Sequence, residues 1–414
     1  MPALLVALIA LATLAFGAVY PWGYLPLFTL AALIGGTGLV RGGVPPAIRP
    51  LATALVFTCL AVALQLVPMP RATVESLSPQ SGSILRNFSL IFASGVTDRQ
   101  TLSIDPASTQ VAALGLAALV LYLVGLTGLA GGAMLRRVPP RLAAFVLAMA
   151  LFGIYSRENS NGDTLVYWFW RPQDNVGASP MGPFVNRNHF GGWMLMSVCL
   201  VVGWIFGQVE RARQHRRHGS TALAWLSSAE ANGIWMMALA AVMAVVSLFW
   251  SLSRSSITGL AVSAVAFAWL ALRRPGLGTT RRIGVLAVLG SALLAGVAWR
   301  GPTALIGRFE EGANLVSRVD AWRDGWRVVR DFPIAGTGLN TYSDAMLFYQ
   351  TRNRDFHLAQ AHNDYLQLLA EGGSSGPSPR RSRSSCSSSA CAGTCGRRGP
   401  NHAATGSAPA RRSG

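Results

Sequence analysis

Three short polar clusters stand at the ends of long apolar segments, and they hold the residue types best suited to chemistry. They are Asn186-Arg187-Asn188-His189, Ser253-Arg254-Ser255-Ser256, and Ala361-His362-Asn363-Asp364 with Glu371 further along the chain. An arginine binds a phosphate through parallel N–H bonds, and a histidine can take up a proton near neutral pH. The clusters are therefore suited to an anionic substrate and to a hydroxyl that must lose its proton.

Each cluster also has a purely structural interpretation. Asn186 can cap a helix, and Arg187 or Arg254 can extend to lipid head groups. Arg254 also lies in a serine-rich turn that suits a phosphate. His189 fits a hydrogen-bonded interface residue as well as it fits a ligand, whereas His362 lies in a polar loop where its titration can serve catalysis. The residues alone leave these alternatives open.

The sequence lacks the motifs of several classes of chemistry. The sequence has no Walker A loop, no HExxH pair and no Asp-rich metal motif, so we expect no metal and no other cofactor. Cys386, Cys391 and Cys395 do not have the spacing of a zinc site. The net charge of +18 comes from arginines near membrane ends, so we expect no nucleic acid partner.

The segments that position the clusters are long and apolar. Hydrophobic residues make up 51% of the chain and charged residues only 13%, against about a quarter in soluble domains. Apolar blocks of this length predict spanning helices, because the bilayer offers backbone groups no other hydrogen-bond partner. We predict an all-α, polytopic transmembrane bundle over residues 1–299. Its spans, about nine in number, lie at 3–19, 23–40, 51–67, 110–130, 142–155, 190–208, 233–252, 256–272 and 283–299.

The arginines of the short loops predict the orientation of this bundle. They fall in every second loop, at 41–49, 136–141, 211–217 and 273–282. Such basic loops stay in the cytoplasm, so the intervening loops and all three polar clusters lie on the outer side. All 35 basic residues are arginines, which indicates GC-rich coding and a bacterial source.

A large outer loop over residues 300–364 is expected to form a helical subdomain. Apolar residues at helical spacing predict an amphipathic helix over 314–331, which ends before Pro333. A turn at Gly336 and Gly338 and a short helix near 341–350 follow. Residues 365–373 are expected to begin a further helix, which is truncated.

The last segment, 374–414, contains no Leu, Ile, Val, Phe, Met, Trp or Tyr. It cannot bury enough apolar surface to fold, so we predict a disordered tail rich in Ser and Arg. A second hypothesis is a frameshift, because Leu, Ala and Val codons of a GC-rich gene read one base off tend to give Ser, Arg, Cys and Pro. An apolar span in another reading frame would support it.

These clusters resemble the O-antigen ligase and O-antigen polymerase superfamily of membrane proteins. The likeness is carried by Phe184-Val185-Asn186-Arg187-Asn188-His189-Phe190, Ser253-Arg254-Ser255-Ser256, Val316-Ser317-Arg318, and Ala361-His362-Asn363-Asp364-Tyr365-Leu366 with Glu371-Gly372-Gly373. Residues 331–338 and 64–68 add to it, so it extends from about residue 60 to 373.

The resemblance implies an inverting, metal-independent glycosyltransferase of the bacterial inner membrane, with its active site facing the periplasm. The donor would be a glycan on undecaprenyl diphosphate, and the acceptor lipid A core, another repeat unit or a protein hydroxyl. By position, Arg187 and Arg254 would bind the diphosphate and His362 would be the general base. Secondary candidates are Arg318, Glu371, His189 and Asn186.

The family continues after the Gly-Gly pair with further membrane helices, which this chain lacks. A genuine tail would leave the His362 helix without its anchor and predicts an inactive chain. Besides the glycan transferase, two alternatives remain. One is a transporter or flippase for a lipid-linked or anionic solute, although such proteins place ionisable residues at mid-membrane and the spans here are almost free of charge. The other is a non-catalytic partner in envelope assembly.

Overall fold

A computed structural model describes residues 2–129, 132–160, 168, 179–214, 229–273, 290, 313–352, 354 and 357–373. The chain divides into a large unit, Met1–Gly376, and a second unit, Pro377–Gly414. All described residues belong to the first unit. The predicted disordered or frameshifted tail at 374–414 lies outside the described residues, so both hypotheses about it stay open.

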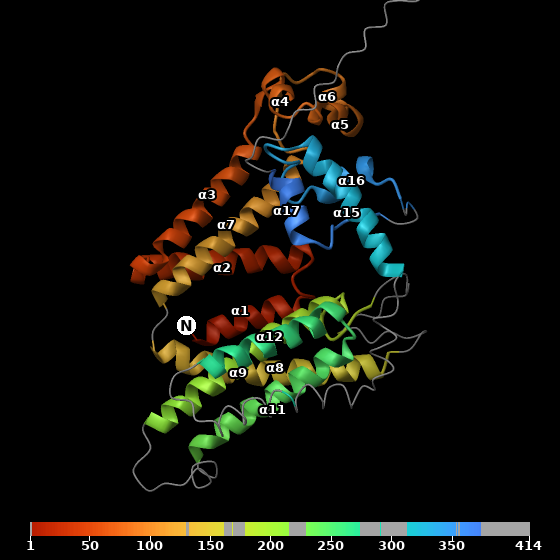
Figure 1. Cartoon of the computed structure of the whole chain (residues 1–414). Coiled ribbons are helices and arrows are strands. Elements are labelled where there is room, and N and C mark those ends of the chain that lie inside the picture. Colours follow the sequence, from red (N-terminus) through yellow and green to blue (C-terminus); the bar gives the residue numbers. More distant parts are fainter. Residues whose placement is uncertain are drawn as a thin grey trace, which may run out of the picture. The chain divides into compact units, whose positions relative to one another are not determined.

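The apolar segments fold into helices, which confirms the predicted all-α, polytopic fold class (Figure 1). Among the described residues, six stretches are long and apolar enough to cross a membrane: Pro21–Gly42 (α2), Pro46–Gln65 (η1, Pro46–Ile48, and α3, Arg49–Gln65), Pro106–Leu129 (α7), Arg137–Glu158 within α8 (Gly132–Glu158), Arg187–Arg211 within α9 (Arg187–Gln214), and Asn232–Trp250 within α11 (Ala229–Trp250). They correspond to the predicted second to seventh spans. Shorter apolar helices, α1 (Pro2–Leu14) and α12 (Arg254–Arg273), take the places of the predicted first and eighth spans. The predicted ninth span at 283–299 lies outside the described residues except for Gly290.

The membrane helices pack in two ways. Helices α2 and α7 approach backbone to backbone, since a methyl group added to Gly38 would lie 2.1 Å from the carbonyl oxygen of Gly125. Close contact through small residues is typical of helix pairs in membranes, where apolar side chains gain nothing by leaving the lipid. Helices α8, α9 and α11 instead share a core of large side chains that includes Val146, Met194 and Phe249.

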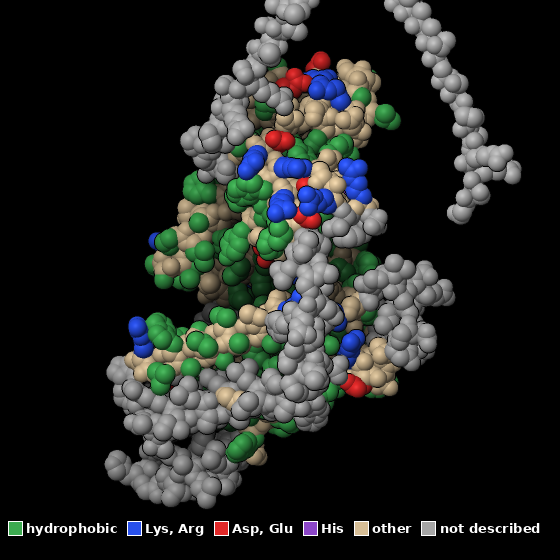
Figure 2. Space-filling model, turned by 45° about the vertical axis from the view of Figure 1, so that its right-hand side comes forward, with side chains coloured by type: hydrophobic (Ala, Val, Ile, Leu, Met, Phe, Trp, Pro, Cys, Tyr) green, Lys and Arg blue, Asp and Glu red, His purple; other side chains and the backbone are tan. Residues whose placement is uncertain are grey.

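A second core lies outside these helices. It joins two segments far apart in sequence, because Ile84 and Ile104 pack with residues of 321–370 such as Val328, Phe332 and Leu366. The first segment holds strand β1 (Met69–Pro70), helices α4 (Arg71–Leu77), α5 (Ser81–Phe88) and α6 (Leu90–Ala93), and strand β2 (Arg99–Gln100), which pairs antiparallel with β1. The second holds α15 (Ala313–Asp331), α16 (Tyr342–Tyr349) and α17 (Asp364–Gly372). Figure 2 shows basic side chains gathered on this part of the molecule.

Helices α15 and α16 correspond to the helices predicted at 314–331 and 341–350. Aspartates on α15 hold the end of α16 and the loop after it. Asp331 accepts from the hydroxyl of Tyr349, the last residue of α16, at 2.6 Å, and Asp324 accepts from the Thr351 amide and hydroxyl, each at 2.8 Å. The predicted division into residues 1–299, 300–364 and 365–373 stays a prediction. The second core includes helix α17 and the loop before α7 as well as the expected subdomain.

Candidate functional site

A polar pocket of about 700 Å³ lies where the second core meets the first turns of α9 and α12. Five of the candidate residues line it: Asn186, His189, Arg318, His362 and Glu371. The pocket therefore brings together residues from three sequence clusters and from α15, as their expected position on one side of the membrane requires.

Arg187 and Arg254 are not among the residues that line the pocket. Each is half-buried and is the first residue of its helix, α9 and α12 respectively. Their neighbours Asn188 and Ser255 do line the pocket, as does Asp364 at the start of α17. Three helix N-termini therefore border one cavity. The helix dipole makes each of them partly positive, which favours an anion.

A glycine brings the starts of α9 and α12 together. A methyl group added to Gly191 would lie 2.6 Å from Ser256 Oγ and 2.9 Å from Ser251 Oγ, so only a glycine allows this approach. The serines mainly bond to one another: Ser256 Oγ donates to Ser253 Oγ at 2.9 Å, and the Ser256 amide donates to the same oxygen at 3.4 Å. The serine-rich turn is therefore first of all a helix cap, and it leaves Ser255 exposed at the pocket.

His362 has an unusual backbone, with φ at 51°, in the left-handed region that non-glycine residues avoid. Both neighbours fix it. The Ala361 carbonyl accepts from Trp322 Nε1 at 2.9 Å, and the Ala361 amide donates to Gln367 Oε1 at 3.2 Å. On the other side, Asn363 Oδ1 accepts from the Leu366 amide at 3.2 Å and caps α17. Such strain costs about 1–3 kcal/mol and is typical of functional sites.

The surroundings of His362 keep its imidazole neutral. Partial burial lowers the pKa of His362 below its ordinary value of 6.5, and the nearby positive charges of Arg318 and His189 lower it further. A histidine with a lowered pKa is neutral at neutral pH, and its unprotonated ring nitrogen can accept a proton. Its side chain remains exposed to the pocket.

Glu371 has a largely structural position, although it also lines the pocket. Its carboxylate is buried and accepts from the amides of Asn340 at 2.9 Å and Tyr342 at 3.2 Å, and from Gln367 Nε2 at 3.1 Å. It thereby caps the start of α16, where Thr341 provides no side-chain cap. Burial raises the pKa of Glu371, and these hydrogen bonds oppose the rise.

Gln65 is a positioning residue that sequence reasoning did not assign. From the end of α3 its Nε2 donates to the carbonyls of Ala335 at 2.7 Å and Glu371 at 2.9 Å, and its Oε1 accepts from the Leu339 amide at 3.0 Å. It thus ties the end of α17 and the loop before α16 to a membrane helix. The signal was a single amide inside the apolar run 60–67, within a motif noted only for its resemblance.

One protein family model matches part of the chain. The family model for O-antigen ligases matches residues 239–376. This part of the chain is similar to O-antigen ligases. The resemblance predicted from the polar clusters is thereby confirmed. No curated protein and no solved structure gives a match.

The O-antigen ligase match contains Arg254, Arg318, His362 and Glu371, and ends just after the Gly372-Gly373 pair. Asn186, Arg187 and His189 lie before it. The apolar helices are those of a multi-pass membrane protein, and the match supports a role in O-antigen assembly. The family implies lipid-linked glycan donors and acceptors in general.

An apolar cavity adjoins the polar pocket. It has a volume of about 680 Å³ and is lined by the C-terminal half of α3, by Leu116 of α7 and by the loop 334–339. Leu368 lines both cavities, so the polar and apolar spaces meet at α17. Among the described residues, no group of three or more His, Cys, Asp or Glu side chains is arranged to hold a metal ion.

Proposed function

We propose that this chain transfers a glycan from an undecaprenyl-diphosphate-linked donor to an acceptor hydroxyl on the periplasmic side of the inner membrane. The transfer inverts the anomeric centre and uses no metal. The observation that carries the proposal is a neutral His362 in a polar pocket with Arg318 and His189, directly beside an apolar cavity. An amphipathic donor needs both spaces, one for its charged head and one for its hydrocarbon chain.

The donor diphosphate has two sources of electrostatic support in this pocket. Arg318 and the N-termini of α9, α12 and α17 present positive charge to the cavity, and they stabilise the negative charge that grows on the leaving diphosphate. Arg187 and Arg254 belong to the first turns of two of these helices. We assign them to the diphosphate site, where binding of the donor draws their side chains toward the phosphates.

His362 acts on the acceptor. Its neutral imidazole removes the proton from the acceptor hydroxyl as that oxygen forms a bond to the anomeric carbon. On the opposite face the bond from this carbon to the diphosphate oxygen breaks, and undecaprenyl diphosphate leaves with the bonding electrons. A single displacement of this kind inverts the configuration, and the proton passes from His362 to water.

The test uses the purified full-length chain in detergent, with an undecaprenyl-diphosphate-linked repeat unit and no added metal or nucleotide. Lipid A core, free repeat units and a protein acceptor are offered separately, and product is followed by mass spectrometry. We expect transfer to one acceptor class, and a fall of about a hundred- to ten-thousand-fold with His362→Asn. Asparagine tolerates the left-handed backbone, so this change removes the base while keeping the turn.

His357→Asn is the matched control, because His357 is exposed, lies outside the pocket and bonds only to Ser343 Oγ among the described residues. Equal activity of the His362→Asn variant and the parent chain would overturn the role of His362. Donor binding without transfer to any acceptor, together with donor movement across the membrane of proteoliposomes, would contradict the enzyme and favour a transporter or flippase.

A further inference from the structure

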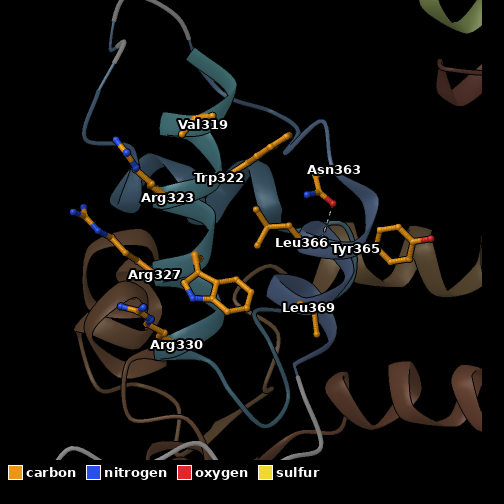
Figure 3. Close-up of a pocket in the computed structure, with 10 residues that line it drawn as sticks. Val319, Trp322, Arg323, Arg327, Arg330, Asn363, Tyr365, Leu366 and Leu369 are labelled. Carbon is orange, nitrogen blue, oxygen red and sulfur yellow. Dashed lines mark hydrogen bonds between the residues drawn. The ribbon is translucent and has the colours of Figure 1, made fainter. Parts of the chain in front are cut away.

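A second groove lies between α15 and α17, on the other side of the segment that carries His362 (Figure 3). Its volume of about 650 Å³ falls within the range of about 300–1,000 Å³ that is usual for small-ligand sites. Asn363 and Tyr365 line this groove, whereas His362 and Asp364 line the polar pocket. The four consecutive residues therefore alternate between two cavities.

One edge of the groove is strongly basic. Arg323, Arg327 and Arg330 are spaced by four and three residues, so they share one face of α15, and Figure 3 shows them extending from the same side of the helix. No acidic residue is among the described residues that line the groove. Arg323 pairs with Asp320 at 3.2 Å and Arg327 pairs with Asp324 at 3.4 Å. Both carboxylates are largely buried and are shared with Arg352 and Thr351, so they offset the arginine charge only in part.

The other walls of the groove are aromatic and apolar. Trp326 is 45% exposed and Tyr365 is 84% exposed, although both are large side chains that folding would normally cover. Trp322 forms part of the same wall, and its indole N–H is already bound to the Ala361 carbonyl. Exposed rings beside guanidinium groups suit a ligand that has both flat apolar faces and negative charges.

We propose that this groove binds an anionic glycan, a sugar chain bearing phosphate or carboxylate groups, as the acceptor for the reaction at His362. Sugar rings present C–H faces that stack on Trp326 and Tyr365, and the arginines bind the acidic substituents. The acceptor role of the glycan rests on the proposed function, whereas its binding in the groove does not. Asn363, which lines the groove, directly follows His362, which lines the pocket, so a chain bound in the groove lies close to the proposed base.

A membrane surface is the competing occupant, since tryptophan and arginine are also common at lipid interfaces. The geometry favours the glycan. The aromatic residues line a concave groove between two helices and are edged by arginines, whereas a bilayer is a flat partner that requires a protruding apolar face.

The test measures binding of a fluorescent pentamannose 6-phosphate to the full-length chain in detergent, with the dephosphorylated oligosaccharide as its neutral counterpart. We expect the phosphorylated form to bind at least about tenfold more tightly, because charge-assisted bonds to arginine are strong. The double change Arg327→Ala with Arg330→Ala should abolish this difference. Arg86→Ala is the control, because Arg86 is an exposed arginine of α5 that lines none of the three cavities.

Two further measurements keep the outcome decisive. Tyr365→Ala removes a side chain that is 84% exposed, so a loss of binding there reflects lost stacking and not unfolding. Equal binding of both oligosaccharides to the parent chain would overturn the proposal. The proposal would also be overturned if the parent chain bound phosphatidylglycerol vesicles but not the phosphorylated glycan, and if the double arginine variant lost that vesicle binding.

The failure of this inference can be told apart from the failure of the proposed function. The His362→Asn variant should bind the phosphorylated oligosaccharide as tightly as the parent chain does. Arginine-dependent binding without any glycan transfer would contradict the proposed reaction and still support the groove as a site for anionic glycans. Efficient transfer with the same KM for acidic and neutral acceptors, in both the parent chain and the double variant, would contradict the role of the groove and still support the proposed reaction.

Discussion

At the scale of single residues, the charge state of His362 controls the proposed reaction. Its pKa lies below 6.5, mainly because it is partly buried and also because Arg318 and His189 are near. Only the neutral imidazole accepts a proton, so kcat/KM should be constant near neutral pH and fall as the pH drops through this lowered pKa. A pH profile of the transfer reaction measures this limb directly. A limb centred at or above pH 7 would contradict the assignment.

Removing a neighbouring charge should move this limb. In Arg318→Gln the imidazolium form of His362 loses a repulsive neighbour, so the pKa of His362 should rise and the acid limb should shift toward higher pH. The donor KM should also increase, because Arg318 lines the pocket. Arg354→Gln is the matched control, because Arg354 is exposed and lies outside the pocket. An unchanged limb in Arg318→Gln would mean that burial alone lowers the pKa.

Glu371 should matter for stability before it matters for chemistry. Glu371→Ala leaves the amides of Asn340 and Tyr342 without their buried acceptor, which costs about 1–3 kcal/mol for each unsatisfied group. Glu371→Gln should lose less, because one amide oxygen still accepts and no charge is buried. Thermal unfolding of the purified variants in detergent gives the order. A Glu371→Ala variant as stable as the parent chain would contradict the capping role.

At the scale of elements, the loop before α16 depends on backbone contact with the end of α17. Gly336 has φ at 66°, and a methyl group added there would lie 2.2 Å from the carbonyl carbon of Glu371. Gly336→Ala should therefore be strongly destabilising and should expose the extramembrane core to protease. Gly372→Ala is the control, because its added methyl group meets nothing within 4 Å. Equal protease resistance of both variants would contradict this account of the loop.

The elements themselves were largely predictable from sequence. Apolar blocks such as Pro106–Leu129 have one stable form in lipid, and the spacing of apolar residues over 314–331 has one helical explanation. The meeting of His189 with His362 followed from placing both clusters on one side of the membrane. Contacts between residues far apart in the sequence could not be predicted. Gln65 bonds to Ala335, 270 residues away, and no local pattern encodes that contact.

In the candidate site, too, some features could be predicted from the sequence and others depend on how the helices pack. Its residue types were visible because polar residues stand out against the apolar segments that flank them. Which side chains point into the cavity depends on helix rotation, and there Arg318 lines the pocket while Arg187 and Arg254 do not. The basic groove was missed because Arg323, Arg327 and Arg330 belong to the polar face of an amphipathic helix. A groove forms only once α17 packs against α15, and no local pattern predicts that pairing.

At the scale of the whole molecule, packing constrains the membrane topology. Residues 68–105 and 313–373 share one core, so both segments lie on the same side of the membrane. Helix α9 starts at the polar pocket, α11 returns to it and α12 leaves it again, so Arg273 lies at the opposite end of the bundle from α15.

The arginine pattern then predicts which side faces the periplasm. The loop between α2 and α3 is basic and should be cytoplasmic, whereas the two segments of the shared core should be periplasmic. In a variant without native cysteines, Ser94→Cys and Arg354→Cys should react with an impermeant maleimide on spheroplasts. Ala47→Cys should react only after the membrane is opened. All three positions are exposed, so access depends on the side of the membrane alone. Labelling of Ala47→Cys in intact spheroplasts, with protection of the other two, would put His362 in the cytoplasm and remove the periplasmic reaction.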